Sequence, residues 1–144
     1  MLARNLLKIC ANLVLFIKKV INSDHFINQS RQNPTDFIRT RKLPFPNLML
    51  FLTNLVKGSY QDELDHFFKA IFKFDVAQHL VTKAALAKAR MKIKFQAFIE
   101  LNAQLIDYFY INFEPQKWQG FILLAIDGTT VQLPRIDSIM KHFG

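Results

Sequence analysis

The sequence predicts a mainly helical chain that ends in a short β hairpin. Apolar residues recur at the three- and four-residue spacing of a helix in several segments between residues 6 and 113. Residues 121–126 instead form a continuous apolar run, typical of a strand covered on both faces, and a second strand pattern follows the Asp127-Gly128 turn at residues 129–134. With 51% apolar residues and 15 phenylalanines in 144 residues, the chain can bury a sizeable core.

The first predicted helix, residues 6–21, carries one apolar stripe that we expect to pack on protein. Lys8 and Lys18 enclose nine uncharged residues, far fewer than the roughly 20 that span a bilayer, and no signal-peptide cleavage site follows. A helix lying on a membrane surface is the alternative. The single cysteine, Cys10, cannot form an internal disulfide, which fits a protein of the reducing cytoplasm. Because Cys10 belongs to the stripe, we expect it to be a core thiol. The stripe consists of Leu6, Leu7, Cys10, Leu13, Val14, Ile17, Val20 and Ile21.

Prolines and capping residues then divide the chain into shorter helices. Asn33-Pro34 predicts a helix start at "PTDFIRTRK", residues 34–42. Two prolines precede "NLMLFLTNLVKG", residues 47–58, which is apolar nearly all round and is therefore predicted to be buried. Ser59 is the predicted cap of "YQDELDHFFKAIF", residues 60–72, whose first turn is acidic as the helix dipole favours.

Positive charge is concentrated in two parts of the chain, whose formal net charge is +8. Residues 1–60 hold nine basic against two acidic residues, and residues 83–94 hold five against none. Such stripes indicate a polyanionic partner, either a nucleic acid or an anionic membrane surface. A merely solvated helix face is the alternative.

The segment "VTKAALAKARMKIK", residues 81–94, is the candidate DNA-binding helix. Thr82 is its predicted cap, and four alanines make it a strong, narrow helix. At 100° per residue Lys83, Arg90 and Lys94 fall on one face, and Lys88 and Lys92 on the other side are expected to reach flanking phosphates. The sequence therefore predicts DNA contacts from these five residues.

The last predicted helix, "FQAFIELNAQLIDYFYINF", covers residues 95–113 and carries an apolar stripe that is expected to face the core. The stripe consists of Phe95, Phe98, Ile99, Ile106 and Phe109. Trp118 leads out of the helical region, so the predicted domains are a helical, DNA-binding domain at 1–118 and a β segment at 119–144.

Three stretches resemble, in order and spacing, the front part of insertion-sequence transposases of the DDE type, in particular the family named after insertion sequence four. They are "RKLPFPNLMLFLTNLVKGSYQDELDHFF", "VTKAALAKARMKIKFQAFIELN" and "WQGFILLAIDGTTVQLP". The resemblance covers about Phe37 to Gly144. It implies DNA transposition as the function, transposon ends as the partner, and a ribonuclease-H-like fold beginning at 119–144.

The resemblance also implies a role for Asp127. In such transposases the carboxylate of the "IDGT" strand is the first of three acidic residues that together hold Mg²⁺ ions at a phosphodiester. The other two, an aspartate on a later strand and a glutamate on a later helix, are not found before Gly144. We therefore expect a truncated ribonuclease-H-like domain that does not hold Mg²⁺ by itself.

Two functions remain open at this point. One is the front part of a metal-dependent DNA-transferring enzyme, inactive alone; the other is a DNA-binding helical module without catalytic activity. A membrane-surface protein built on residues 6–21 is a more distant third. A homo-oligomer is compatible with each of these functions.

Overall fold

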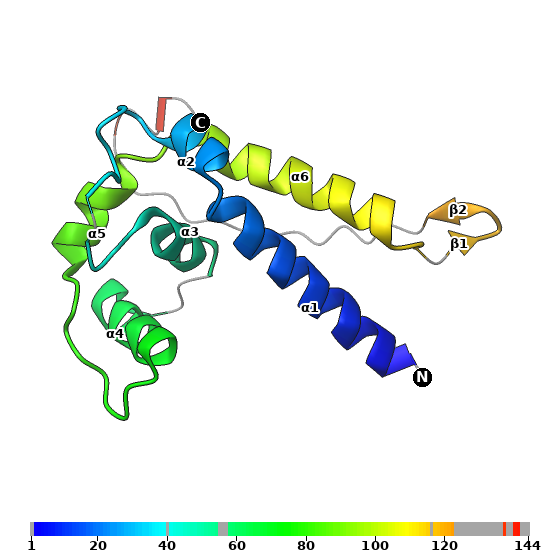
Figure 1. The fold of residues 1–144 in the computed structure, drawn as a ribbon, viewed down its shortest axis with the longest axis horizontal. Helices are drawn as coiled ribbons and strands as arrows, with labels where there is room; N and C mark the ends of the chain where they lie inside the picture. Colours follow the sequence, from blue (N-terminus) through cyan, green and yellow to red (C-terminus); the bar gives the residue numbers. More distant parts are fainter. Residues whose placement is uncertain are drawn as a thin grey trace. The chain divides into compact units, whose positions relative to one another are not determined.

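The computed structural model describes residues 2–39, 41–54, 58–115, 117–122, 137, 140 and 141. The chain forms two compact units, residues 1–113 and residues 114–144. The first unit is helical, as predicted, and Figure 1 shows α3, α4 and α5 grouped on one side of α2. Its helices are α1 (Leu2–Ile21), α2 (Asp24–Ser30), α3 (Phe45–Thr53), α4 (Tyr60–Phe72), α5 (Lys83–Arg90) and α6 (Gln96–Asn112).

Helix α3 supplies the centre of the core, which confirms the prediction of a buried apolar helix. Pro44 is its N-cap and Pro46 lies in its first turn, where the absent backbone N–H costs no hydrogen bond. The helix buries Phe45, Leu48, Met49 and Phe51. The other large, fully buried side chains come from three neighbouring helices and are Ile21, Phe26, Leu64 and Phe68.

Helix α4 begins where the sequence predicts. The Ser59 hydroxyl accepts a hydrogen bond from the backbone N–H of Asp62 at 3.4 Å. Asp62 and Glu63 occupy the first turn, where the helix dipole favours negative charge. At the other end Lys73 adopts a left-handed conformation with φ of 54° and closes the helix.

Helix α1 packs on protein mainly through its C-terminal part. Val20 and Ile21 are buried, and Phe16 stacks on Tyr108 of α6 with ring centroids 4.1 Å apart. The helix also contacts α3, as expected for the stripe. The prediction of a core thiol is wrong, because Cys10 is exposed. Leu7 and Val14 of the same stripe are exposed as well, because only the C-terminal end of α1, at Val20 and Ile21, is fully covered by its packing partners.

The predicted core stripe of the last helix is also wrong in part. Phe95 and Ile99 are 69% and 62% exposed, whereas Ala97 and Leu101 are buried. Because α6 is apolar on more than one face, its periodicity is compatible with more than one inward stripe. The stripe that faces the helical unit begins at Ala97 and Leu101, with Phe98 partly buried beside it.

The predicted helix at residues 34–42 is absent from the part of that segment that the structure describes. Residues 34–37 form a turn, in which the Asp36 carboxylate accepts hydrogen bonds from the backbone N–H and the side-chain amide of Asn33, both at 3.1 Å. Phe37 then adopts a positive φ of 60°, which a right-handed helix does not permit. The Asn33 and Asp36 side chains thus stabilise a turn in place of a helix start.

A short helix that the sequence pattern does not predict precedes this turn. Helix α2 begins after Ser23, whose hydroxyl accepts from the backbone N–H of Phe26 at 3.3 Å. Phe26 is buried and contacts Phe45 edge to face, with ring centroids 6.0 Å apart. Seven residues with one buried aromatic give little periodicity to recognise.

The second unit contains a short antiparallel hairpin of β1 (Lys117–Trp118) and β2 (Phe121–Ile122). The turn lies at Gln119 and Gly120, with φ values of 49° and 87°. A strand therefore begins at Phe121 as predicted, but its described partner precedes it in the chain. The predicted turn at Asp127-Gly128 lies outside the described residues.

Among the helices described, none combines the length and the apolar character needed to cross a bilayer. The longest, α1, has 20 residues and carries Lys18 and Lys19 in its last turn.

Candidate nucleic-acid interface

Helix α5 begins at the predicted cap and docks on the unit through one apolar residue. The Thr82 hydroxyl accepts from the backbone N–H of Ala85 at 3.2 Å. Leu86 is buried with 3% exposure and anchors the helix. Three basic residues of α5, Lys83, Lys88 and Arg90, are exposed. The helix thus contacts the core of the unit through Leu86 and exposes its basic side chains to solvent.

The helix ends earlier than predicted, and this changes the place of Lys94. Residues 91–94 leave the helix, and Ile93 forms an antiparallel bridge with Arg31. The Lys94 backbone N–H donates to the Ser30 carbonyl at 2.8 Å, and its ammonium group donates to the Gln29 carbonyl at 3.1 Å. Lys94 therefore does not share a helix face with Lys83 and Arg90, and the predicted cluster of these three residues is corrected to two.

Lys92 is held by a buried carboxylate. Its ammonium group lies 2.9 Å from Asp36, a residue with 6% exposure. The hydrogen bond from Lys92 is the main cause that holds the pKa of Asp36 below its ordinary value; hydrogen bonds from Asn33 act in the same direction and burial opposes them. The charge of Lys92 is thus largely balanced within the protein, and the pair ties the turn at residues 34–37 to the end of α5.

The pair makes a pH-dependent contribution to stability. A carboxyl group whose pKa is lowered on folding stabilises the protein above its unfolded pKa, and this contribution is lost as the pH falls through the folded pKa. We expect Asp36→Asn to lower the unfolding free energy at pH 7, and the difference from the wild type to shrink below about pH 4. Urea unfolding at both pH values measures it.

The exposed loop residue Asp75 offers the matched control for this prediction. Asp75→Asn removes one carboxylate without touching the Lys92 pair, so its effect should be small at both pH values. A deficit of Asp36→Asn that is unchanged at low pH would contradict an electrostatic role for Asp36.

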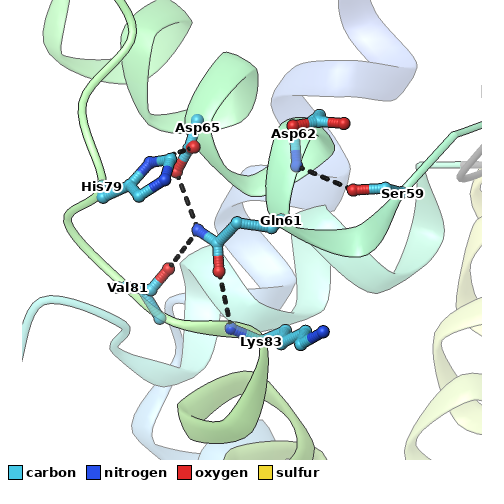
Figure 2. Close-up of polar contacts among 7 residues, drawn as sticks. All are labelled: Ser59, Gln61, Asp62, Asp65, His79, Val81 and Lys83. Atoms are coloured by element: carbon cyan, nitrogen blue, oxygen red, sulfur yellow. Dashed lines mark hydrogen bonds and ion pairs between the residues drawn. The ribbon is translucent and has the colours of Figure 1, made fainter.

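The start of α5 is held by a glutamine from α4 (Figure 2). The Gln61 side-chain oxygen accepts from the backbone N–H of Lys83 at 2.9 Å. Its amide nitrogen donates to the Val81 carbonyl at 3.0 Å and to the Asp65 carboxylate at 2.9 Å. Asp65 is buried and also pairs with His79 of the preceding loop. One side chain therefore fixes both the entry of α5 and the loop that leads to it.

A pocket of about 620 Å³ lies between this loop, α5 and the segment that precedes α3. Its apolar lining comes from Phe37, Leu43, Pro44, Leu80, Val81, Ala85 and Ala89. Five basic residues also line it, together with one carboxylate, Asp36, which is already paired. The basic residues are Arg39, Arg41, Lys42, Lys88 and Lys92. The pocket thus combines an apolar lining with an excess of positive charge.

Arg39, Arg41 and Lys42 belong to the basic N-terminal part of the sequence, but they are not among the predicted DNA-binding residues. Within the part of the chain that the structure describes, they have no ion-pair partner, and all three are exposed. The signal was available in the sequence, because three cations within four residues directly precede the Leu43-Pro44 break. Their proximity to Lys88 required the fold.

The predicted metal-binding residue Asp127 lies outside the described residues. Among the residues that are described, no group of three or more histidine, cysteine, aspartate or glutamate side chains is arranged to hold a metal ion.

Comparisons with known proteins do not identify a relative. No protein-family model matches the chain, and neither a curated protein nor a solved structure is significantly similar to it.

Proposed function

We propose that the helical unit binds DNA through a basic surface formed by α5 and the segment before α3. The proposed contacts are Arg39, Arg41, Lys42 and Lys88, which line one pocket, and Lys83 and Arg90, which are exposed on another face of α5. The observation that carries the proposal is that basic residues from two segments, about 45 positions apart in the chain, line the same pocket. A DNA backbone, which carries one charge every few ångströms, suits such an array better than a single small anion does.

Helix α5 has the features that phosphate contacts need. Its alanines keep the helix narrow, its basic side chains are exposed, and Gln61 fixes its first turn. Because alanine offers no hydrogen-bonding group to a base edge, we assign Lys83, Lys88 and Arg90 to phosphates and not to base recognition. Lys92 and Lys94 are assigned smaller roles, since both already interact within the protein.

The three motifs that resemble DDE transposases extend this proposal. In this extended proposal, the DNA is a transposon end and the chain is the front part of such a transposase. Asp127 is then the first of the metal-binding carboxylates of that enzyme. Asp127 would then act through Mg²⁺ rather than by contacting DNA, so Asp127→Asn should leave the affinity for duplex DNA unchanged. A non-catalytic DNA-binding module would use the same basic surface.

A salt titration of duplex binding tests the DNA contacts. The slope of log affinity against log salt is negative for DNA binding. We expect the triple substitution Lys83→Ala, Lys88→Ala, Arg90→Ala to reduce the magnitude of this slope by about 2.7, at about 0.9 for each lost phosphate contact. The loss should be similar for unrelated duplex sequences, because phosphates carry no sequence information. Fluorescence anisotropy between about 50 and 200 mM salt measures both quantities.

Three exposed lysines of α1 provide a control with the same loss of charge. Lys8, Lys18 and Lys19 lie outside the proposed surface. Their joint replacement by alanine should change the slope much less than the α5 substitutions do. Equal slopes for the two triple variants would mean that binding follows net charge alone, and the assignment to α5 would be abandoned.

A further inference from the structure

The pocket beside α5 has an apolar lining that phosphate contacts do not explain. Ala85 and Ala89 lie one turn apart on α5 and line the pocket together with Leu43 and Pro44. Charged side chains at an exposed surface would suffice to hold a sugar-phosphate backbone. An open cavity of about 620 Å³ with this lining is of the size that small organic ligands occupy.

Phe37 gives this lining an aromatic surface in a fixed position. Its backbone has a positive φ of 60°, and its ring contacts the buried Phe45 edge to face with centroids 5.3 Å apart. The turn that carries it is held by Asp36 and Asn33. A ring fixed in this way can stack on a planar ligand without first being ordered.

We propose that this pocket takes one unpaired nucleotide, with its base against Phe37 and the alanines of α5 and its phosphates on Arg39, Arg41, Lys42 and Lys88. The inference rests on the proposed DNA-binding function and specifies a ligand for the same surface. A planar base has apolar faces that suit the lining, and its phosphates suit the basic residues around it. The nucleotide is either part of a DNA strand or a free nucleoside phosphate.

The test compares a blunt duplex with the same duplex carrying a single-stranded extension. The wild type should bind the extended DNA about tenfold more tightly, which corresponds to one stacked base. An extension of abasic sugar phosphates keeps the charges but lacks the bases, so it should give no such advantage.

A pocket-filling variant and its control locate the effect. Ala85 is exposed and lines the pocket, so Ala85→Leu should fill it without disturbing the core. This variant should lose the tenfold advantage and bind blunt duplex as the wild type does. Ala84 is exposed but does not line the pocket, and Ala84→Leu should keep the advantage. Circular dichroism checks that both variants are folded.

The outcomes separate the two proposals. If the wild type binds neither the blunt duplex nor the extended duplex, and does not bind the free nucleotide either, the proposed function and this inference both fail. If blunt duplex binds but the extension adds nothing, and a deoxynucleoside 5′-monophosphate does not bind either, only the nucleotide pocket is refuted. If Ala85→Leu still bound the extended DNA about tenfold more tightly than the blunt duplex, the nucleotide pocket would be refuted as well.

Titration with the free monophosphate distinguishes the two sources of the nucleotide. Binding of the monophosphate to the wild type but not to Ala85→Leu, without any effect of the extension, would assign the pocket to a free nucleotide. Competition of the monophosphate with the extended DNA, but not with the blunt duplex, would assign it to a nucleotide of the strand.

Discussion

Phe68→Ala should lower the unfolding free energy by about 3–5 kcal/mol. Phe68 is completely buried in α4, and it contacts two further rings, Phe67 edge to face and Phe72 in a stack. Removal of its ring leaves a cavity among side chains that cannot collapse fully, so the lost transfer energy and the lost contacts add. For a domain with typical stability this is a large part of the total, and urea unfolding followed by circular dichroism would measure it.

Phe72, the ring that stacks on Phe68, provides the control for this substitution. Phe72 lies one turn further along α4 and is 47% exposed. Phe72→Ala removes a ring of the same size, but much of that ring is already in water, so the expected loss is below about 1.5 kcal/mol. Similar losses for the two variants would show that Phe68 is not part of a tightly packed core.

Gln61→Ala should lower both stability and DNA affinity, although Gln61 itself is not proposed to touch DNA. The substitution removes three hydrogen bonds, to Val81, Lys83 and Asp65, and leaves partly buried polar groups without those partners. We expect a loss of about 2–3 kcal/mol in unfolding free energy. Because the same bonds fix the first turn of α5, duplex affinity should fall under conditions in which the variant remains folded.

Gln78, an exposed residue of the loop before α5, provides the matched substitution. Gln78→Ala also removes a glutamine side chain, but an exposed one, and should change neither the unfolding free energy nor the duplex affinity appreciably. If Gln61→Ala lowered stability but a folded sample bound duplex DNA as tightly as the wild type, the position of α5 would not matter for binding. The proposed phosphate contacts would then be in doubt.

Local signals in the sequence were sufficient where one residue decides the local structure. Ser59 and Thr82 each accept a hydrogen bond from a backbone N–H of the first helical turn, and both were predicted as caps from their type and position alone. The buried character of α3 was predictable for a similar reason, since a helix that is apolar nearly all round has no face suited to water.

The errors arose where a distant partner decides the structure. Lys94 was expected on a helix face, but its backbone pairs with Ser30, more than sixty positions away. Asn33-Pro34 reads as a helix start, yet the Asp36 carboxylate is shared by Asn33 and Lys92 and stabilises a turn. The basic residues 39–42 and α5 were both visible in the sequence, but only the fold brings them to one pocket.

The attachment of α5 at both ends has a consequence for the entropy of binding. An isolated helix of eight residues would be largely unfolded in water, because so few hydrogen bonds do not offset the cost of nucleation. Here Gln61 holds the first turn, and the bridge between Arg31 and Ile93 holds the chain just beyond the last. The basic side chains therefore start from an ordered backbone, and a ligand that binds them does not have to order the helix. Recognition by this surface should resemble the docking of a preformed element more than folding coupled to binding.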